Sequence, residues 1–216
     1  MKQQKIGLVD CGVGNFRSLI NALDYLGFSN YIISNQEEEL QLSDRMLLPG
    51  VGSFSGAISS LKKNNLLDFL YKYPQSDRPL LGICLGMQLL FNSSTEGGLN
   101  KGLSLFKGDV IHFTEHKSYI PHDPFLIPNV GLNTISASKN TNKVFPIFKG
   151  IPDDSKFYFT HSYCVPADQP SSVFHSEYGP CRFTSVASMG NIYGVQFHPE
   201  LSREVGLALI SNFILL

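Results

Sequence analysis

The chain has 216 residues, of which 43% are hydrophobic, and its formal net charge is −1. This length and apolar content suffice for one α/β domain with a buried core, and the near-neutral charge is unlike the basic footprint of a nucleic-acid-binding protein. The apolar segments 82–91 and 205–216 are too short to span a membrane, and the first ten residues lack a signal-peptide pattern, so we expect a cytosolic protein.

The first half of the sequence alternates short apolar runs, which predict buried strands, with apolar residues at helical spacing. The predicted strands cover residues 5–9, 31–33, 46–48 and 80–83, and the predicted helices cover 15–26, 53–61, 66–71 and 85–92. Gly27 is the expected C-cap of the first helix, and the acids at 37–39 are interpreted as a solvated helix face. Strand alternating with helix predicts a parallel sheet covered on both faces.

The second half has a different pattern. Residues 98–150 are rich in Gly, Pro, Asn and Lys with short apolar pieces, which predicts antiparallel strands and loops. Strands at 157–159, 182–187 and 192–196 are expected to return to the core, and a helix at 204–213 closes the chain. Because no segment reads as a long linker, we expect a single domain over residues 1–216.

Cys84 stands where a predicted strand meets a predicted helix, between Gly82 and Gly86. Flanking glycines permit a sharp, strained strand-to-helix turn that presents the middle residue as a nucleophile. At the start of a helix the dipole and the unpaired N–H groups favour a thiolate. The sequence therefore predicts a cysteine nucleophile.

His198 and Glu200 follow the last predicted strand. An extended backbone puts them on the same side, where the imidazole can serve as the base and the carboxylate can fix its tautomer. An isolated His-x-Glu reads more simply as a core histidine beside a surface acid. Beside a Gly-x-Cys-x-Gly turn, the catalytic interpretation is the better one.

The segment Pro-Gly-Val-Gly at 49–52 ends another predicted strand. An acyl-transfer site needs N–H donors for the developing oxyanion, and we expect them from Leu85 and from the turn at Val51 and Gly52. A phosphate loop is the competing interpretation. It lacks both the third glycine and a Lys-Ser/Thr pair, and residues 10–15 fail the dinucleotide pattern because Arg17 occupies the third glycine position.

The other cysteines and the histidines carry no further predicted site. Four cysteines without a C-x-x-C pair predict neither a disulfide scaffold nor structural zinc, so Cys11, Cys164 and Cys181 are interpreted as buried small hydrophobes. His112, His116 and His122 invite a metal interpretation, but their segment reads as strand and loop without a well-placed acid. No metal and no cofactor are predicted.

Six ordered motifs, spanning nearly the whole chain, resemble those of the class I (triad-type) glutamine amidotransferases, and most closely the glutaminase subunits of imidazole glycerol phosphate synthases. The motifs are Asp-x-Gly-x-Gly-Asn at 10–15, Pro-Gly-Val-Gly-x-Phe at 49–54, Gly-Ile-Cys-Leu-Gly-Met-Gln at 82–88, Ser-x-Glu-Gly at 94–97, His-Ser-Tyr at 161–163 and Gly-Val-Gln-Phe-His-Pro-Glu at 194–200. The resemblance implies a single flavodoxin-like α/β domain with a mostly parallel sheet, helices on both faces and an antiparallel excursion in the second half.

The resemblance also implies the chemistry. Cys84 attacks the side-chain amide of glutamine, and His198, with Glu200 as the third member of the triad, protonates the departing ammonia. Water then hydrolyses the glutamyl thioester. The positions matching those that hold glutamine are Gly50, Gln88, Glu96, His161, Ser162 and Tyr163. From helical spacing alone, Gln88 lies one turn after Cys84 and faces the same pocket, with an exposed helix amide as the alternative.

Family members deliver ammonia through a protein channel to a synthase partner, a (β/α)8-barrel cyclase, and the resemblance implies a heterodimer of this kind. The corresponding partner-facing positions are Asn15, Asn129, Leu132, Asn133, Tyr158 and Leu201. Three of them depart from the family pattern: Asn129 and Leu132 replace His and Trp, and Leu201 replaces Lys. Outside this set, Cys11 replaces the Tyr of the family's first motif. We hypothesise that the peptide at 49–52 must flip on partner binding to complete the oxyanion hole.

Three other functions stay open at this point. A paralogue could feed ammonia to a sugar amidotransferase system for surface polysaccharide, which would account for the departures at the partner-facing positions. A stand-alone cysteine hydrolase acting on γ-glutamyl amides would need no partner. A regulatory protein with a vestigial triad is disfavoured by the intact Cys84, His198 and Glu200.

Overall fold

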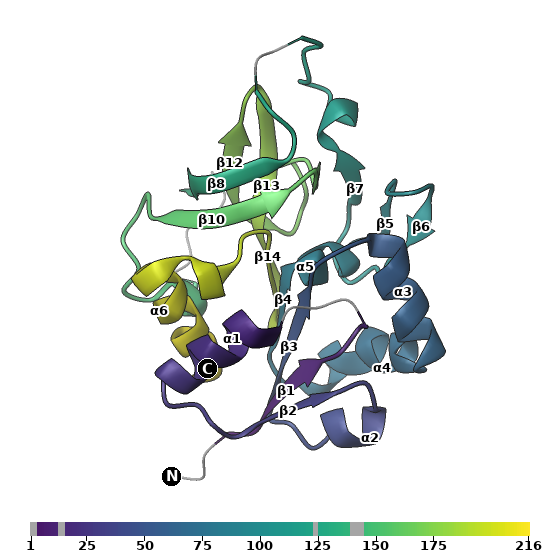
Figure 1. Ribbon diagram of the computed structural model, residues 1–216, viewed down its shortest axis with the longest axis vertical. Helices are drawn as coiled ribbons and strands as arrows, with labels where there is room; N and C mark the ends of the chain where they lie inside the picture. Colours follow the sequence, from purple (N-terminus) through teal and green to yellow (C-terminus); the bar gives the residue numbers. More distant parts are fainter. Residues whose placement is uncertain (1–3, 13–15, 123–124, 139–144) are drawn as a thin grey trace.

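The computed structural model describes residues 4–12, 16–122, 125–138 and 145–216 (Figure 1). Its helices are α1 Phe16–Tyr25, α2 Glu37–Leu40, α3 Phe54–Lys63, α4 Leu66–Lys72, α5 Leu85–Leu89 and α6 Arg203–Ile214, with 3₁₀ turns η1 Tyr73–Ser76, η2 Phe113–Glu115, η3 Pro146–Phe148 and η4 Pro199–Leu201. Its strands are β1 Ile6–Val9, β2 Tyr31–Ser34, β3 Arg45–Gly50, β4 Leu80–Cys84, β5 Ser93–Ser94, β6 Asn100–Lys101, β7 Asp109–His112, β8 Asn129–Thr134, β9 Ser136–Ala137, β10 Lys156–His161, β11 Tyr163–Cys164, β12 Ser172–Tyr178, β13 Cys181–Met189 and β14 Ile192–Val195.

The main sheet, traced over the described residues, has the strand order β2-β1-β3-β4-β14-β13-β12-β9. The strands from β2 to β14 are parallel, and β13, β12 and β9 extend the sheet in antiparallel fashion. The predicted α/β class, with a mostly parallel sheet and a later antiparallel part, is confirmed.

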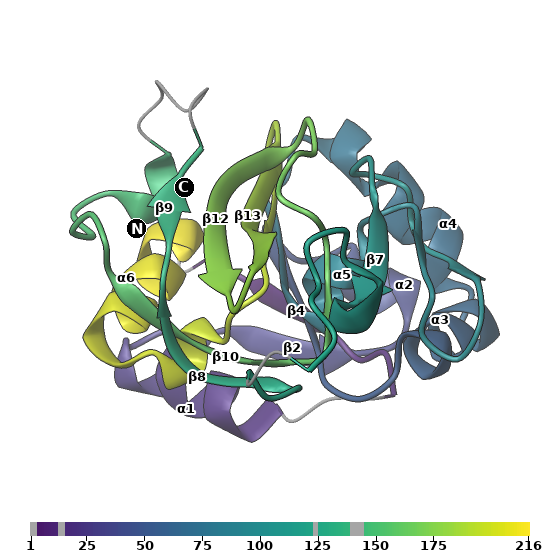
Figure 2. The ribbon, with the colours of Figure 1, turned by 90° about the horizontal axis from the view of Figure 1, so that it is seen from above.

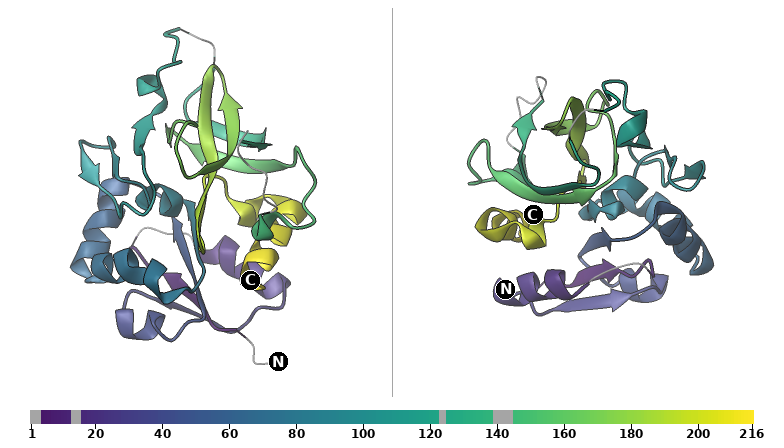
Figure 3. Two further views of the ribbon diagram at one scale, coloured as in Figure 1. Left: turned by 180° about the vertical axis from the view of Figure 1, so that it is seen from behind. Right: turned by 45° about the horizontal axis from the view of Figure 1, so that its top comes forward.

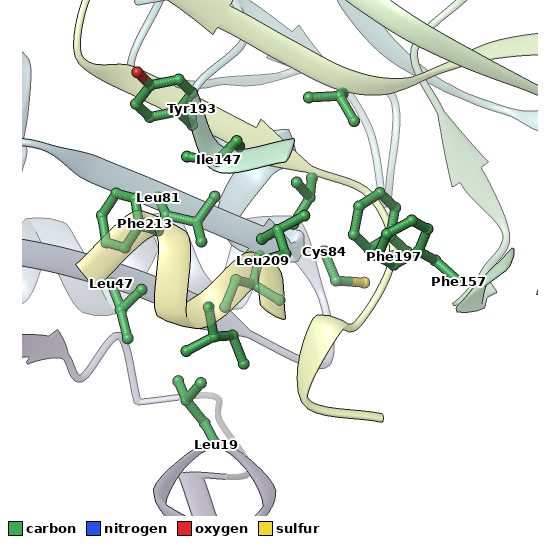
Figure 4. Close-up of a cluster of buried hydrophobic side chains, with 14 of the residues drawn as sticks. Leu19, Leu47, Leu81, Cys84, Ile147, Phe157, Tyr193, Phe197, Leu209 and Phe213 are labelled. Atoms are coloured by element: carbon green, nitrogen blue, oxygen red, sulfur yellow. The ribbon is translucent and has the colours of Figure 1, made fainter. Parts of the chain in front are cut away.

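Two hydrophobic clusters cover the two faces of the sheet. Alternate residues of β3 contribute to opposite clusters: Leu47 packs with α1 and α6, whereas Met46 and Leu48 pack with α3, α4 and α5. Seen from above, α1 and α6 lie on one side of the sheet and α3 and α4 on the other (Figure 2). Figure 4 shows members of the first cluster, with Cys84 among them. Side chains alternate between the two faces along each strand, so both faces are apolar and helices pack on both of them.

Two smaller sheets stand beyond the main one. Strands β8 and β10 pair antiparallel and cross the β12–β13 hairpin (Figure 3), and β11, β7, β5 and β6 form the other sheet. The strand predicted at 157–159 therefore packs its phenylalanines into the core but does not join the main sheet. The predicted return of this strand to the core is confirmed, and its pairing with β8 depends on contacts distant in sequence.

The remaining predicted elements correspond to observed ones, with shifted ends. The helix predicted at 85–92 ends at Leu89, and Gly27 has the left-handed φ of 79° expected of a C-cap. Strand β12 was not predicted. In the part of the chain that the structure describes, no helix is long and apolar enough to cross a membrane.

The nucleophile turn depends on close packing at Gly86. A Cβ atom there would lie 1.7 Å from the carbonyl oxygen of Leu48, and φ at Gly82 and Gly86 is not in the left-handed region. Gly86 is therefore needed because α5 lies directly against β3, and Gly82 because a Cβ atom there would lie 2.7 Å from the carbonyl oxygen of Gly86, while the positive φ of 52° belongs to Cys84 itself. Strain at the cysteine and space at the glycines are separate requirements.

We expect Gly86→Ala to lower the free energy of unfolding by more than about 3 kcal/mol, because backbone must move to relieve the contact. Gly150→Ala is the matched control: Gly150 has φ 75° and open space around its Cβ position, so we expect a loss of only about 1 kcal/mol from the left-handed backbone. Urea unfolding of both variants measures the difference. Equal losses would contradict the packing argument.

Candidate active site

The carboxyl ends of three neighbouring parallel strands form the candidate site. Gly50 ends β3 opposite Cys84 at the end of β4, and Val195 at the end of β14 pairs with Ile83. Cys84 has φ 52° and ψ −109°, is 7% exposed, and is followed at once by α5. A non-glycine residue held in this region is strained, and such strain is concentrated at functional sites.

His198 and Glu200 come from the segment after β14. The Nδ1 atom of His198 lies 2.8 Å from Oε1 of Glu200, and both side chains are buried. Glu200 belongs to the 3₁₀ turn η4 rather than to an extended strand, so the predicted pairing holds although the predicted backbone does not. Because Glu200 occupies Nδ1, the other ring nitrogen, Nε2, is the one that can exchange a proton with a substrate.

Electrostatics favour the protonated form of His198. Burial lowers its pKa, but interaction with Cys84, followed by the hydrogen bond and charge of Glu200, outweighs burial and raises the pKa well above its ordinary value. The Nε2 atom makes no hydrogen bond of normal geometry with any described residue, although it lines the same cavity as Cys84. An imidazolium beside a sulfur is the arrangement of a thiolate nucleophile with a proton donor.

A cavity of about 350 Å³ opens in front of Cys84. Its walls are formed by Val51, Gly52, Cys84, Leu85, Gln88, Glu96, Pro128, Thr160, His161, Ser162, Tyr163 and His198. The volume suits a small substrate such as an amino acid. Ten of the residues predicted for catalysis, the oxyanion hole or glutamine binding line this one cavity; Gly50 and Glu200 stand next to residues that line it.

Glu96 connects the cavity to the oxyanion segment. Its Oε2 accepts a hydrogen bond of 2.7 Å from the backbone N–H of Phe54, the first residue of α3. Gly52, with φ 102°, lies two residues earlier. One carboxylate oxygen of Glu96 therefore holds the start of α3, and the other has no hydrogen bond with the residues that the structure describes.

A hydrogen-bond chain runs behind the cavity. Nδ1 of His161 lies 2.8 Å from the carbonyl oxygen of Tyr163, so this nitrogen carries the proton, and Nε2 accepts from Nδ2 of Asn129 at 3.1 Å. Asn129 in turn accepts from Asn133 at 2.9 Å. Both ring nitrogens of His161 are thus occupied by protein groups, and the ring holds the Tyr163 carbonyl in place; because His161 also lines the cavity, its role in glutamine binding stays a prediction.

The sequence matches the glutamine amidotransferase class-I family over residues 7–216. A protein of Methanocaldococcus jannaschii named imidazole glycerol phosphate synthase subunit HisH is 40% identical over 209 residues, covering 97% of this chain and 98% of that protein. The chain belongs to the class I glutamine amidotransferases. The subunit HisH of Halalkalibacterium halodurans is 39% identical over 212 residues, covering 96% of this chain and 94% of that protein.

Solved structures agree on the fold of this class I glutamine amidotransferase. The structure of PurLQS from Thermotoga maritima has a TM-score of 0.68 and 17% identity, and the match covers 98% of both chains. The resemblance drawn from the six motifs, including its HisH type, is confirmed by these comparisons.

The positions expected to face a partner divide into two groups. Leu132 and Leu201 are exposed by 44% and 46%, and the half-buried Tyr158 pairs with Leu132 across the β8–β10 ribbon. Asn133 is half-buried on the other face of the ribbon. Asn15 lies outside the described residues.

Asn129 was predicted to face the partner, and its observed position corrects that prediction. It is fully buried, and its side chain is held between Asn133 and His161. An amidotransferase of this family with His at this position would place an ionisable ring there, whereas Asn129 is neutral. The departure from the family pattern at Asn129 therefore lies in the buried hydrogen-bond chain behind the cavity and not on a docking surface.

Pro128 and Thr160, which line the cavity, and Gln196 and Ser202, which lie beside it, were not predicted as site residues. Gln196 is fully buried, and its Nε2 lies 3.6 Å from Sγ of Cys84. The hydroxyl of Ser202 accepts from the N–H of Tyr158 at 2.9 Å and donates to the carbonyl oxygen of His198 at 2.6 Å. These two hydrogen bonds hold the backbone of His198 in place. Gln196 lies directly after β14 and inside a motif already noted, and that motif was the available signal.

The other predictions on cysteines and histidines have these outcomes. Cys11, Cys164 and Cys181 are buried and form no disulfide among the described residues. His116 is buried against the carbonyl of Arg182, and His112 contacts Thr114. Among the residues the structure describes, no cluster of His, Cys, Asp or Glu could hold a metal ion.

The buried His161 predicts a dependence of stability on pH. Burial lowers its pKa from 6.5 to about 4, although the bond to the Tyr163 carbonyl opposes this. A depressed pKa in the folded state contributes stability above pH 6.5 that is lost as the pH falls through about 4, a loss of up to about 3 kcal/mol. We expect His161→Asn, which keeps a donor for Tyr163, to flatten this acid slope in urea unfolding.

The control for the acid slope is His122→Asn, because His122 is exposed. This variant should retain the slope of the parent chain between pH 6.5 and pH 4. A His161→Asn variant with an unchanged slope would show that a different group causes the acid destabilisation.

Proposed function

We propose that this chain is the glutaminase subunit of an imidazole glycerol phosphate synthase, which hydrolyses glutamine and passes ammonia to a cyclase subunit of the (β/α)8-barrel type in histidine biosynthesis. The observation that carries the proposal is the convergence of Cys84 and the Glu200-bound imidazole of His198 on one cavity. The full-length similarity to proteins named HisH supports the choice of pathway.

The geometry supports a thioester mechanism. Sγ of Cys84 attacks the side-chain carbonyl carbon of glutamine, and the tetrahedral oxyanion accepts from the N–H of Leu85 and from the turn at Val51 and Gly52. The imidazolium of His198 gives its Nε2 proton to the leaving nitrogen, and ammonia departs as the carbonyl reforms. His198, now neutral, takes a proton from water, whose oxygen attacks the thioester, and Cys84 leaves as thiolate with glutamate formed.

The cavity offers recognition groups for the amino-acid end of glutamine. The second carboxylate oxygen of Glu96 suits the α-ammonium, and the side-chain oxygen of Gln88 remains as an acceptor because its N–H groups are used elsewhere. Ser162 and Tyr163 also line the cavity, and the Tyr163 carbonyl accepts from Gln88. In this proposal these groups hold the substrate with its amide toward Cys84.

The exposed face of the β8–β10 ribbon is the proposed docking surface for the cyclase. Val130 and Leu132 are exposed there, and Leu201 lies on η4, which contacts β10. Ammonia released at Cys84 would leave through a channel completed by the partner, and docking would reorient the peptide at 49–52 to complete the oxyanion hole.

We expect Leu132→Asp and Leu201→Asp each to weaken partner binding at least about tenfold, because a carboxylate would be buried without a counter-charge in an apolar contact. Leu42→Asp is the matched control: Leu42 is 67% exposed before β3, at the end of the sheet away from the site. Titration of the partner against glutaminase rate gives the affinities. Leucine variants with the affinity of the control would remove this face as the docking surface.

The proposed function is tested by reconstitution. Purified chain is assayed for glutamate release alone, with a cyclase partner, and with partner plus the aminoimidazole-forming acceptor. Strong stimulation by partner, with nitrogen from glutamine incorporated into the acceptor, is the expected result. Equal rates with and without partner would favour a stand-alone γ-glutamyl hydrolase.

The replacement of Trp and Lys by Leu132 and Leu201 favours one second candidate, a paralogue that serves a sugar amidotransferase system for surface polysaccharide. Both candidates share the glutaminase chemistry and differ in the partner. Stimulation by a sugar-amidotransferase partner and not by the histidine-pathway cyclase would select the paralogue.

A further inference from the structure

Gln196 contacts both Cys84 and Gln88, two residues that line the proposed glutamine pocket. It is fully buried, with Nε2 3.6 Å from Sγ of Cys84 and Oε1 3.1 Å from Nε2 of Gln88. The proposed mechanism does not use it. A buried amide with both ends engaged is held rigidly, so its orientation toward the sulfur decides what it contributes.

The orientation of the Gln196 amide follows from a backbone carbonyl. The oxygen of Tyr163 can only accept, and it lies 3.1 Å from the Gln88 side chain, so Gln88 must present its amide nitrogen there. That same nitrogen reaches Gln196, which must therefore present its oxygen. The remaining end of Gln196, its NH₂ group, then faces Cys84.

The Tyr163 carbonyl is itself held in place. His161 donates to it through Nδ1 at 2.8 Å, and Nδ2 of Asn129 donates to the other ring nitrogen of His161, Nε2. The direction of every hydrogen bond from Asn129 to Cys84 is thus determined by which groups can donate and which can accept. These buried hydrogen bonds orient the Gln196 amide so that its N–H group points toward Sγ of Cys84.

We propose that Gln196 donates a hydrogen bond to Sγ of Cys84 that stabilises the thiolate, with its amide oriented by Gln88, the Tyr163 carbonyl and His161. This inference rests on the proposed role of Cys84 as nucleophile. A neutral donor stabilises the anion without competing for the proton that His198 must give to ammonia. It also links the thiolate to Gln88, so the reactive sulfur and the glutamine pocket are aligned by the same contact.

The charged and titratable groups around the sulfur are the same in the parent chain and in Gln196→Met, whereas Gln196→Glu adds one carboxylate to them. They are His198 with Glu200 after β14, His161 on β10, Tyr163 on β11, and Glu96 after β5. A change in the pH profile of Gln196→Met therefore reports the amide itself.

The test measures the pH dependence of alkylation of Cys84 by iodoacetamide in the full chain, followed by site-resolved mass spectrometry. Gln196→Met keeps the shape without a donor, and we expect the alkylation midpoint to rise by about one pH unit. Gln196→Glu puts a carboxylate beside the sulfur while keeping an acceptor for Gln88, and we expect a rise of about two units. Gln75→Glu at an exposed position is the control and should leave the midpoint unchanged.

The outcomes separate this inference from the proposed function. If the parent chain shows glutaminase activity and both folded Gln196 variants retain its midpoint, the inference is overturned and the function stands. If Cys84 labels no faster than a buried cysteine and the parent chain releases no glutamate, the function itself fails. Should both variants fail to fold, Gln88→Met decides: a raised midpoint supports the oriented donor, and an unchanged one overturns it.

Discussion

Replacing Cys84 with alanine is expected to lower glutaminase turnover in the partner complex by at least about 10⁴-fold, because no other group can form the covalent intermediate. The side chain faces a cavity that His198 also lines, and it is held there by strained backbone at the end of β4. Removal of the sulfur leaves the cavity and the fold intact. The measurement is glutamate release under saturating glutamine.

The matched control is Cys164→Ala. Burial, with a smaller contribution from Cys181, raises the pKa of the Cys164 thiol, so this cysteine stays protonated in the core. Its replacement should leave turnover within about twofold, since it touches neither substrate nor His198. With ammonium salt as the nitrogen source, the Cys84→Ala complex should still form product, because the acceptor chemistry belongs to the partner. Residual glutaminase activity near that of the parent would rule out Cys84 as the nucleophile.

Much of this site could be predicted because its geometry is encoded locally. The turn around Cys84 is defined by five consecutive residues, and its glycines are required by contacts that any α5 packed on β3 would make. His198 and Glu200 are two residues apart, so their hydrogen bond survives even though the backbone is a 3₁₀ turn and not a strand. Short sequence separation leaves few alternative arrangements.

The parts that could not be predicted depend on contacts between distant segments. Asn129 was interpreted as a surface position because its neighbours in sequence resemble a partner-facing motif, but pairing of β8 with β10 turns it inward to His161. Gln196 meets Gln88 across 108 positions of sequence. The residues next to Asn129 and Gln196 in sequence do not determine whether these side chains are buried or which distant side chains they contact.

The second large effect is expected from Glu200→Gln, which should lower kcat by about 10² to 10⁴-fold with a much smaller change in KM. Glutamine can still occupy the space beside Nδ1 of His198, but it carries no charge to stabilise the imidazolium. Glu200 acts through His198 and does not line the cavity, so substrate binding is largely preserved. Loss in kcat without loss in KM separates this role from a contact with glutamine.

The pH profile gives a second readout of Glu200 with a defined sign. Burial lowers the pKa of His198, and Cys84 and Glu200 raise it, so removing the Glu200 charge lets the pKa fall. The imidazolium that protonates ammonia is then lost at lower pH, and the alkaline limb of kcat/KM should move to lower pH. Glu204→Gln, at an exposed position in the first turn of α6, is the control and should keep both the rate and the limb. A Glu200→Gln enzyme with parental kcat and an unmoved limb would mean that the carboxylate only packs against the ring.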